Sequence, residues 1–424
     1  MFQSKNNLLY IFLIIFSVFS FIYGFTVRED SAGGGKYDFN NTWNNQKIFN
    51  ENSLINSIKN TKTSEIDTSI NSHFPTSYIL NKFFNPFSKH KESFLKSIFV
   101  LDFFLPIIFF LVLKSVYKKK NVYLIACFSS IIYLSPYFRT SSYWAGMENY
   151  GLFTLIISYY FFSQYLKIII NKKFYIFCFS LFGCFCVYFD QKLVFIPLIY
   201  MYLFFKNEND RSNIIFYLII NFILSIPVLS LIYYWGSLIS PHDTLTRHFG
   251  ILYLEQVGYC FSIISFYLIP YIIIFNKNIY QFLIKNFKYF MVISCLIIVY
   301  FLLLSNYPTN YFEWDHLGKG WAHKLIKTIF TSNLSQKIFL YLIFFISIIT
   351  FFAVSQKRFL IIFMTFFLSI ISLLILPIFQ EYFDPLIFIF LAFFFYKDDE
   401  LNNNLVKFQY IFSLIFLTFT NLYY

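Results

Sequence analysis

The sequence predicts an all-α polytopic membrane protein, and two observations carry this prediction. Hydrophobic residues make up 58% of the 424 residues and charged residues only 13%, which is far from the balance of a soluble globular domain. Apolar runs rich in Phe, Ile, Leu and Tyr also recur along the whole chain, with clusters of lysine between them. We therefore expect a single membrane domain that covers residues 1–424.

The apolar runs predict about 11–13 transmembrane helices, because a helix needs ~20 mostly apolar residues to cross the hydrocarbon core. Several of the runs are shorter than that, notably 193–205 and 385–396, so one hairpin is a candidate for a re-entrant or merged span. The candidate spans are residues 8–25, 97–113, 122–137, 150–169, 174–189, 193–205, 213–236, 257–276, 289–304, 338–354, 359–379, 385–396 and 409–423.

The orientation follows from the lysine clusters, because Lys and Arg next to span ends are retained in the cytoplasm. When the spans are threaded in order, the clusters agree on one face, which predicts a cytoplasmic N-terminus. These residues are Lys5, Lys114, Lys118, Lys119, Lys120, Lys172, Lys173, Lys206, Arg211, Lys285, Lys288, Lys357, Arg358, Lys397 and Lys407. The short loops of the opposite face hold only Arg139, Lys192 and Arg247.

Most acidic residues fall on the outer face in this threading. The exceptions are Glu208, Asp210, Asp398, Asp399 and Glu400. All six histidines also fall outside: His73, His90, His242, His248, His316 and His323. Five carboxylates lie at tight outer turns, where they are expected to converge on one surface: Glu148, Asp190, Glu255, Glu381 and Asp384.

Charge and cysteine usage exclude two classes of function. The net charge of +12 comes from lysines that flank spans and lie near anionic headgroups, so no nucleic-acid partner is implied. The six cysteines lie within spans as small apolar residues, which indicates neither a disulfide framework nor a cysteine metal site. The first span has bulky residues from Ser17 to Tyr23 and is interpreted as an uncleaved anchor.

Two long outer segments, 26–95 and 305–337, are each expected to hold a helix that lies in the membrane interface. In the first, Ile79, Phe83 and Phe87 recur at a spacing of four, and the lysines near them are available for headgroups: Lys82, Lys89 and Lys91. In the second, an apolar stripe is interleaved with lysines; its members are Trp321, Leu325, Ile329 and Phe330.

Little ionisable chemistry is expected inside the bilayer. Asp102 is the clearest buried ionisable residue, and it lies near the outer end of its span. An ion-coupled transporter normally needs such groups at the membrane midplane. The outer carboxylates and cations instead suit a reaction at the outer surface, with Asp102 counted among the candidate substrate-binding residues.

The candidate base is Glu29 or Asp30, directly after the first span. A carboxylate held where the helix leaves the bilayer can take a proton from an acceptor hydroxyl during substitution at a sugar carbon. Spacing alone does not choose between the two residues. A phosphate leaving group needs positive charge at its oxygens, which Arg139, Lys192 and the Arg247–His248 pair are placed to supply.

Other outer residues are candidates for substrate contacts. Glu148 is a candidate for a sugar hydroxyl, with Trp144 or Tyr143 stacking on the sugar ring. The turn Gln380–Pro385 brings Glu381 and Asp384 between two apolar runs, where they are expected to line the same cavity. Asp190 and Asp384 are also conceivable ligands of a divalent cation, although their spacing defines no metal site.

This arrangement resembles the GT-C superfamily of integral membrane glycosyltransferases, which use polyprenyl-phosphate sugars at the outer or lumenal face. Those enzymes carry an acidic residue in a long loop after the first helix, matched here by Glu29 and Asp30, and interfacial helices in that loop. The stretch Ser72-His73-Phe74-Pro75-Thr76-Ser77-Tyr78 is similar to their His-Pro-Pro-x-Tyr segment. The turn Gln380–Pro385 is similar to an Arg-Tyr-Phe-x-x-Pro turn, with Glu381 in place of the arginine.

The resemblance implies a transferase that moves a sugar from a polyprenyl-phosphate donor to a glycan, lipid or protein acceptor. It would act at the periplasmic face of a bacterial inner membrane, with inversion at the anomeric carbon. A lipid-linked oligosaccharide polymerase or ligase is an alternative, although its large loop normally comes late in the chain. A second alternative is a flippase or transporter of a lipid-linked sugar, which needs polar residues in both leaflets. A third is a membrane scaffold without chemistry.

Overall fold

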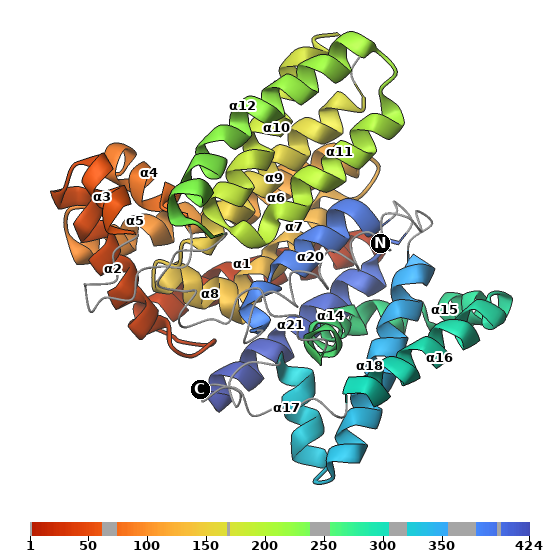
Figure 1. Ribbon diagram of the computed structural model, residues 1–424. Helices are drawn as coiled ribbons and strands as arrows, with labels where there is room; N and C mark the ends of the chain where they lie inside the picture. The colour runs from red at the N-terminus through yellow and green to blue at the C-terminus, as the bar shows by residue number, and fades with distance from the viewer. Residues whose placement is uncertain are drawn as a thin grey trace. The chain divides into compact units, whose positions relative to one another are not determined.

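A computed structural model describes residues 2–61, 74–167, 170–237, 255–304, 320–354, 379–396 and 400–424 (Figure 1). All regular secondary structure in these residues is helical, which confirms the predicted all-α class. The chain divides into two compact units. Unit 1 comprises residues 1–246 and 410–424, and unit 2 comprises residues 247–409.

Within the described residues, six helices are long and apolar enough to cross a membrane, or up to eight if each of two bent helix pairs is one span. This supports a polytopic membrane protein. The six are Asn6–Thr26, Lys91–Val116, Lys172–Phe189, Arg211–Trp235, Leu334–Ala353 and Asn403–Tyr423. The predicted span 359–379 lies almost wholly outside the described residues.

Unit 1 contains the first part of the chain and the end of the last helix. Its elements are α1 (Phe2–Thr26), α2 (Gly35–Glu51), α3 (Leu54–Asn60), α4 (Thr76–Phe84), α5 (Lys91–Phe103), α6 (Leu105–Val116), α7 (Val122–Ser130), η1 (Ile131–Leu134), α8 (Pro136–Tyr143), α9 (Glu148–Tyr165), α10 (Lys172–Phe189), η2 (Gln191–Val194), α11 (Phe195–Asn207) and α12 (Arg211–Trp235). The last helix, α21 (Asn403–Tyr423), begins in unit 2 and ends in unit 1.

The chain bends by 65° between η1 and α8, and the sequence at the bend explains why. Pro136 cannot donate a backbone hydrogen bond, so it suits the first turn of a new helix. Ser135 before it is extended, and its side chain accepts a hydrogen bond from the Phe138 amide, as an N-cap does. The bend places α8, which carries Arg139, against the end of α1.

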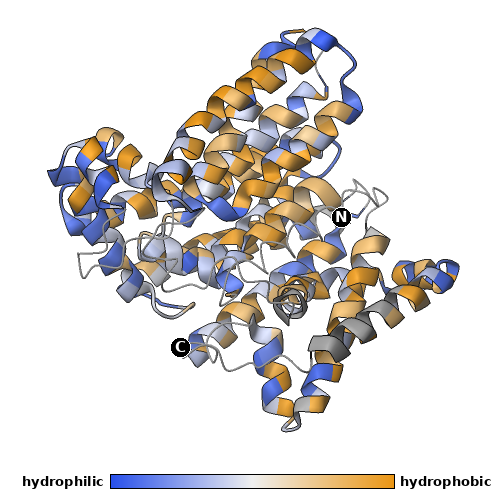
Figure 2. Ribbon diagram, in the orientation of Figure 1, coloured by the Kyte–Doolittle hydropathy of each residue, from blue (hydrophilic) through white to orange (hydrophobic). Residues whose placement is uncertain are grey.

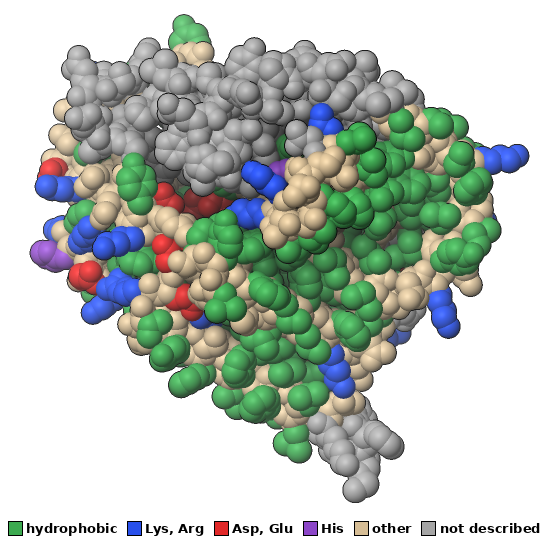
Figure 3. Space-filling model, turned by 90° about the horizontal axis from the view of Figure 1, so that it is seen from below, with side chains coloured by type: hydrophobic (Ala, Val, Ile, Leu, Met, Phe, Trp, Pro, Cys, Tyr) green, Lys and Arg blue, Asp and Glu red, His purple; other side chains and the backbone are tan. Residues whose placement is uncertain are grey.

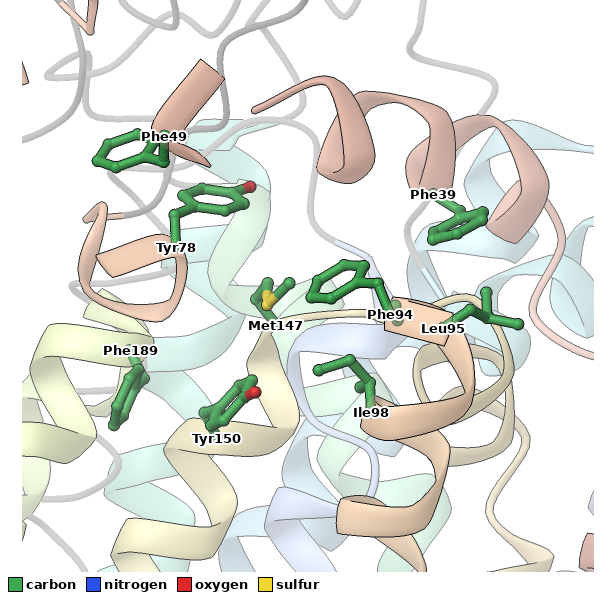
Figure 4. Packing of buried hydrophobic residues seen from close by; sticks show 10 residues of the cluster. Phe39, Phe49, Tyr78, Phe94, Leu95, Ile98, Met147, Tyr150 and Phe189 are labelled. Atoms are coloured by element: carbon green, nitrogen blue, oxygen red, sulfur yellow. The ribbon is translucent and has the colours of Figure 1, made fainter. Parts of the chain in front are cut away.

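The described residues of the segment 26–95, which is predicted to be the first outer segment, form a folded cap with three helices, more extensive than a loop with one interfacial helix. Its helix α2 is more polar than the long apolar helices α1, α6 and α12 (Figure 2). Aromatic side chains of the cap join residues of α5, α9 and α10 in one buried cluster (Figure 4). The members that Figure 4 labels are Phe39, Phe49, Tyr78, Phe94, Leu95, Ile98, Met147, Tyr150 and Phe189.

A helix, α4, forms where an interfacial helix is predicted, and Phe87 of the predicted stripe follows its end. One of the lysines predicted to meet headgroups is engaged within the protein. Phe83 and Phe87 are exposed, as expected. The Lys82 ammonium instead donates to the Phe49 and Asn52 carbonyls, at 2.6 and 2.5 Å. It thereby satisfies carbonyls at the end of α2, which a helix leaves without internal partners.

Hydrogen bonds define two opposite ends of unit 1. At one end, Asn121 bonds to Asn7 and Lys167 bonds to the Ser115 carbonyl, next to the lysine-rich turns. We call the other end the acidic end, because the outer carboxylates of unit 1 belong to the turns that meet there. Those carboxylates are Glu29, Asp30, Glu92, Glu148 and Asp190. The alternation of helix directions in the predicted threading is therefore consistent with the fold of unit 1.

Unit 2 is also helical. Its elements are α14 (Glu255–Ile274), α15 (Asn276–Lys285), α16 (Phe287–Leu304), α17 (Gly320–Ile329), α18 (Asn333–Val354), η3 (Gln380–Tyr382), α20 (Leu386–Phe390), the π-helical η4 (Leu391–Phe395) and the first residues of α21. A helix, α17, forms where the second interfacial helix is predicted, and its Leu325 and Ile329 are exposed.

Hydrophobic side chains cover broad parts of the surface drawn in Figure 3, whereas the acidic side chains in this view gather toward its left edge. The apolar side chains of α12 are largely exposed. Phe222 is 67% exposed and Leu229 54% exposed, and only 6% of the most apolar part of the helix is buried. Such a face is stable only in contact with lipid or with another apolar surface.

Candidate functional site

The loop between α1 and α2 lies along α8 at the acidic end. The Ser31 hydroxyl donates to the Pro136 carbonyl, and the Ala32 amide donates to the Thr140 hydroxyl, both at 2.9 Å. Gly33 and Gly34 have φ angles of 77° and 85°, which glycine adopts at little cost. They turn the chain from α1 into α2 and leave Glu29 and Asp30 between these helices and α8.

Glu29 and Arg139 form an ion pair at this junction. The Arg139 Nε donates to Glu29 Oε1 at 2.9 Å, and Nη2 donates to Oε2. The side chains are 2% and 12% exposed, respectively, so water screens the pair poorly. Bidentate pairing of this kind fixes the orientation of the carboxylate as well as its charge.

Arg139 makes as many hydrogen bonds within the protein as it has N–H donors. Besides its two bonds to Glu29, Nη1 donates to the Ser20 hydroxyl and the Tyr133 carbonyl, and Nη2 donates to the Ser20 carbonyl. A guanidinium has five N–H groups. The predicted role of Arg139 as a phosphate ligand is therefore not supported by this geometry, in which it positions Glu29.

Asp30 has different surroundings. Its carboxylate accepts from the Gly35 amide at 3.0 and 3.2 Å and so caps the first turn of α2, where backbone N–H groups lack helical partners. Burial raises the pKa of Asp30 above its usual value, although backbone hydrogen bonds from Gly33 to Lys36 oppose the rise. Among the described ion pairs, none involves Asp30.

Arg28 is a cation at the site that was not among the sequence-predicted ligands. Its Nη2 donates to Glu92 at 2.7 Å, and the guanidinium lies 5.6 Å from the Phe25 ring and 6.0 Å from the Trp144 ring. The side chain is 37% exposed, and Glu92 is 65% exposed. Its position directly before Glu29 and Asp30 in the sequence is the signal that identifies it as a candidate ligand.

Asn421, Ser20 and Gly24 were also missed, because they reach the site only through the packing of α1 and α21. The Asn421 amide donates to Glu29 Oε1 at 3.2 Å from 392 residues away. A Cβ at Gly24 would lie 2.5 Å from Glu29 Oε2 and 2.6 Å from the Tyr143 hydroxyl. Glycine at this position therefore lets α1 approach the ion pair.

The aromatic residues beside the site have separate roles. Tyr143 is 0% exposed and donates to the Phe21 carbonyl at 2.6 Å, so it has no free ring face, and the prediction that it stacks on a sugar is wrong. Trp144 is half-buried, and its indole N–H donates to the Glu29 carbonyl at 3.0 Å. Of the two, Trp144 is the one that remains a candidate for stacking.

Asp102 and Asp190 are held by their own neighbours. Asp102 is 1% exposed and accepts from the Asn149 amide at 2.7 Å, and Glu148 begins the helix that carries Asn149. Asp190 caps η2 through the Lys192 amide at 3.1 Å and pairs with the Lys192 ammonium at 3.2 Å. Among the described hydrogen bonds and ion pairs, none joins either aspartate to Glu29 or Asp30, so each aspartate has a local structural role in this geometry.

The remaining predicted residues belong to unit 2 or lie outside the described residues. Glu381 and Asp384 belong to unit 2, where the neighbouring Gln380 bridges the Tyr267 hydroxyl of α14 and the Trp321 amide of α17. His73, Arg247 and His248 lie outside the described residues. In the described part of the chain, no group of three or more His, Cys, Asp or Glu side chains is arranged to hold a metal ion.

Comparison with models of known protein families, with curated proteins and with solved structures finds no match to this chain. The case for a function therefore rests on the residues at the acidic end of unit 1.

Proposed function

We propose that the protein is a membrane glycosyltransferase that moves a sugar from a polyprenyl-phosphate donor to a glycan, lipid or protein acceptor. The observation that carries the proposal is the buried Glu29–Arg139 pair, which fixes the loop that presents Asp30 at the end of α1. A preorganised carboxylate on a rigid support is what proton abstraction from an acceptor hydroxyl requires.

In this proposal Asp30 is the base. Glu29 is held by a cation and an amide, whereas the described ion pairs leave Asp30 without a cation. A raised pKa also makes a carboxylate a stronger proton acceptor once it is ionised. Asp30 takes the acceptor proton as the acceptor oxygen bonds to the anomeric carbon, and the carbon–oxygen bond to the phosphate breaks. The polyprenyl phosphate leaves with the electron pair, and the anomeric configuration inverts.

Arg28 supports the phosphate part of the proposal better than Arg139 does. Its single side-chain hydrogen bond in the described residues is to Glu92, so its other N–H groups are available to phosphate oxygens. Trp144, which lies beside Arg28 and is bonded to the Glu29 carbonyl, is placed to pack against the sugar. Lys192 remains a second proposed phosphate ligand, although it is paired with Asp190.

The proposal also covers the superfamily, the number of spans and the orientation of the protein in the membrane. We place the protein in the GT-C superfamily, with about 11–13 spans of ~20 residues, the acidic end in the periplasm and the lysine-rich turns in the cytoplasm of a bacterial inner membrane. The helices α2 and α4 in the first outer segment support this assignment, as does the carboxylate pair directly after α1.

The test is sugar transfer in membranes that contain the wild type, Asp30→Asn or Glu29→Gln at matched protein levels. Radiolabelled polyprenyl-phosphate sugars serve as donors and endogenous molecules as acceptors. We expect Asp30→Asn to lose transfer by ~10²–10⁴-fold, the usual contribution of a positioned base. Thr418→Ala, an exposed change on α21 whose hydroxyl bonds only to its own helix, is the matched control.

Two results would overturn the proposal. If the wild type transfers nothing from a broad donor panel while vesicles show lipid-linked sugar crossing the bilayer, the protein is a transporter. If Asp30→Asn retains full transfer, Asp30 is not the base, and the result for Glu29→Gln then decides whether its neighbour is.

A further inference from the structure

The last helix of the chain reaches the candidate site, and this contact carries the inference. Within unit 1, α1 and the end of α21 run in the same direction. The Tyr410 hydroxyl bonds to the Ser17 hydroxyl and to the Leu13 carbonyl, both at 2.8 Å. About three turns farther along α21, Asn421 meets Glu29.

Asn421 completes the set of donors around Glu29. Its side-chain amide donates to Oε1 at 3.2 Å, beside the Arg139 Nε that donates to the same oxygen at 2.9 Å. Asn421 also donates to the Leu417 carbonyl of its own helix at 3.1 Å, which restricts its side chain. A neutral amide holds the carboxylate without adding charge, so it orients Glu29 rather than neutralising it.

Tyr424 makes a second contact, with the loop beyond Asp30. A Cβ at Gly33 would lie 2.5 Å from Cδ1 and 2.6 Å from Cε1 of the Tyr424 ring. The ring therefore packs directly on the Gly33 backbone, between Asp30 and the helix that Asp30 caps. The Tyr424 amide donates to the Thr420 carbonyl at 3.0 Å, which continues the helical hydrogen bonding of α21 to this residue.

We infer that Asn421 and Tyr424 are positioning residues of the candidate active site, which hold Glu29 and the Gly33–Gly35 backbone so that Asp30 keeps one orientation. The inference rests on the proposed function for its catalytic part. Its structural part, that α21 immobilises the loop between α1 and α2, is measurable without a substrate.

The first measurement is hydrogen–deuterium exchange of the purified protein in detergent or nanodiscs, for Asn421→Leu, Tyr424→Ala and the control Thr418→Ala. We expect the amides from Gly33 to Gly35 to exchange at least tenfold faster in the first two variants than in the wild type and the control. Exchange in α10 should be unchanged, which shows that the fold is retained. Equal exchange of the loop amides in all four proteins would overturn the inference.

The second measurement is transfer kinetics with a polyprenyl-phosphate sugar donor. A positioning role predicts that Asn421→Leu lowers kcat by about tenfold while KM for the donor changes by less than twofold, because binding of the lipid does not depend on Glu29. Unchanged kcat alongside faster loop exchange would overturn the catalytic part. If the wild type shows no transfer but the loop exchange changes as expected, the proposed function fails and the structural inference stands.

Discussion

Arg139 donates two hydrogen bonds to the carboxylate of Glu29, which lies 110 residues earlier in the chain. This pair joins the end of α1 to the short helix α8 and leaves the Arg139 side chain 2% exposed. A charge buried to this extent is tolerated only with a partner and with its donors satisfied. The pair is therefore needed to hold the candidate site in its folded arrangement, apart from any role in the chemistry.

Breaking the pair from one side should be strongly destabilising. Arg139→Leu leaves the Glu29 carboxylate without its cation, and we expect a loss of ~3–5 kcal/mol, which is typical when one partner of a buried pair is removed. Thermal unfolding in detergent measures the loss. The double variant Glu29→Gln with Arg139→Leu should recover part of it, and additive losses would show that the two residues are not coupled.

A single methyl group at Gly24 should disturb the same pair. The Cβ of Gly24→Ala would lie 2.5 Å from Glu29 Oε2 and 2.6 Å from the Tyr143 hydroxyl, so the ion pair must shift. We expect a destabilisation of ~1–3 kcal/mol, as for overpacked interiors. Gly183→Ala is the matched control, because its Cβ would meet neighbours only at 3.4 Å or more. Equal stability of the two variants would argue against close packing at Gly24.

The pH dependence of transfer should report Asp30. The base is active when ionised, so transfer should fall as the pH drops through its pKa. Because burial raises the pKa of Asp30 above 3.8, the midpoint should lie above 3.8. The profile is measured at saturating donor, with the enzyme returned to neutral pH afterwards to exclude irreversible loss. A midpoint at or below 3.8 would contradict the assignment of Asp30 as base.

The pKa of Glu208, in the turn before α12, is shifted in the direction opposite to that of Asp30. Burial alone would raise its pKa, but hydrogen bonds from the Asp210 amide, Tyr165 and Lys172 outweigh burial and lower the pKa from 4.5 to about 2. A depressed pKa contributes stability that is present above the unfolded value and lost as the pH falls through the folded value. Unfolding temperatures should therefore decrease between pH 4.5 and 2.

Glu208→Gln is the control for that measurement, because glutamine does not titrate. The variant should be less stable than the wild type near neutral pH, and the difference should shrink as the pH falls. A difference that stays constant with pH would show that the turn depends on the shape of the side chain and not on its charge.

Labelling with a membrane-impermeant thiol reagent tests which side of the membrane each end of unit 1 faces. Lys36 at the acidic end and Lys118 at the lysine-rich end are both exposed. Both cysteines are introduced in a Cys295→Ser background, which removes an exposed native cysteine. Lys36→Cys should react with the reagent in intact cells, and Lys118→Cys should react only after permeabilisation. The reverse pattern would invert the proposed orientation.

The sequence by itself determined the all-helical, polytopic class of the protein. Composition and the spacing of apolar runs predict membrane helices because the bilayer has a fixed thickness and backbone groups must be paired within it. The same reasoning placed a helix at Thr76–Phe84 and another near Trp321. It also singled out Glu29 and Asp30, whose position directly after an apolar run is a local feature.

Only the tertiary structure decided how those two carboxylates differ. Glu29 meets Arg139 and Asn421, which are 110 and 392 residues away, while Asp30 caps α2 through backbone amides. Lys82 of α4, which bonds to carbonyls at the end of α2, and the buried Tyr143 also have surroundings that the local pattern does not predict, for the same reason. Local pattern fixes which elements form, whereas the pairing of a buried charge depends on which distant side chains packing brings within hydrogen-bond distance.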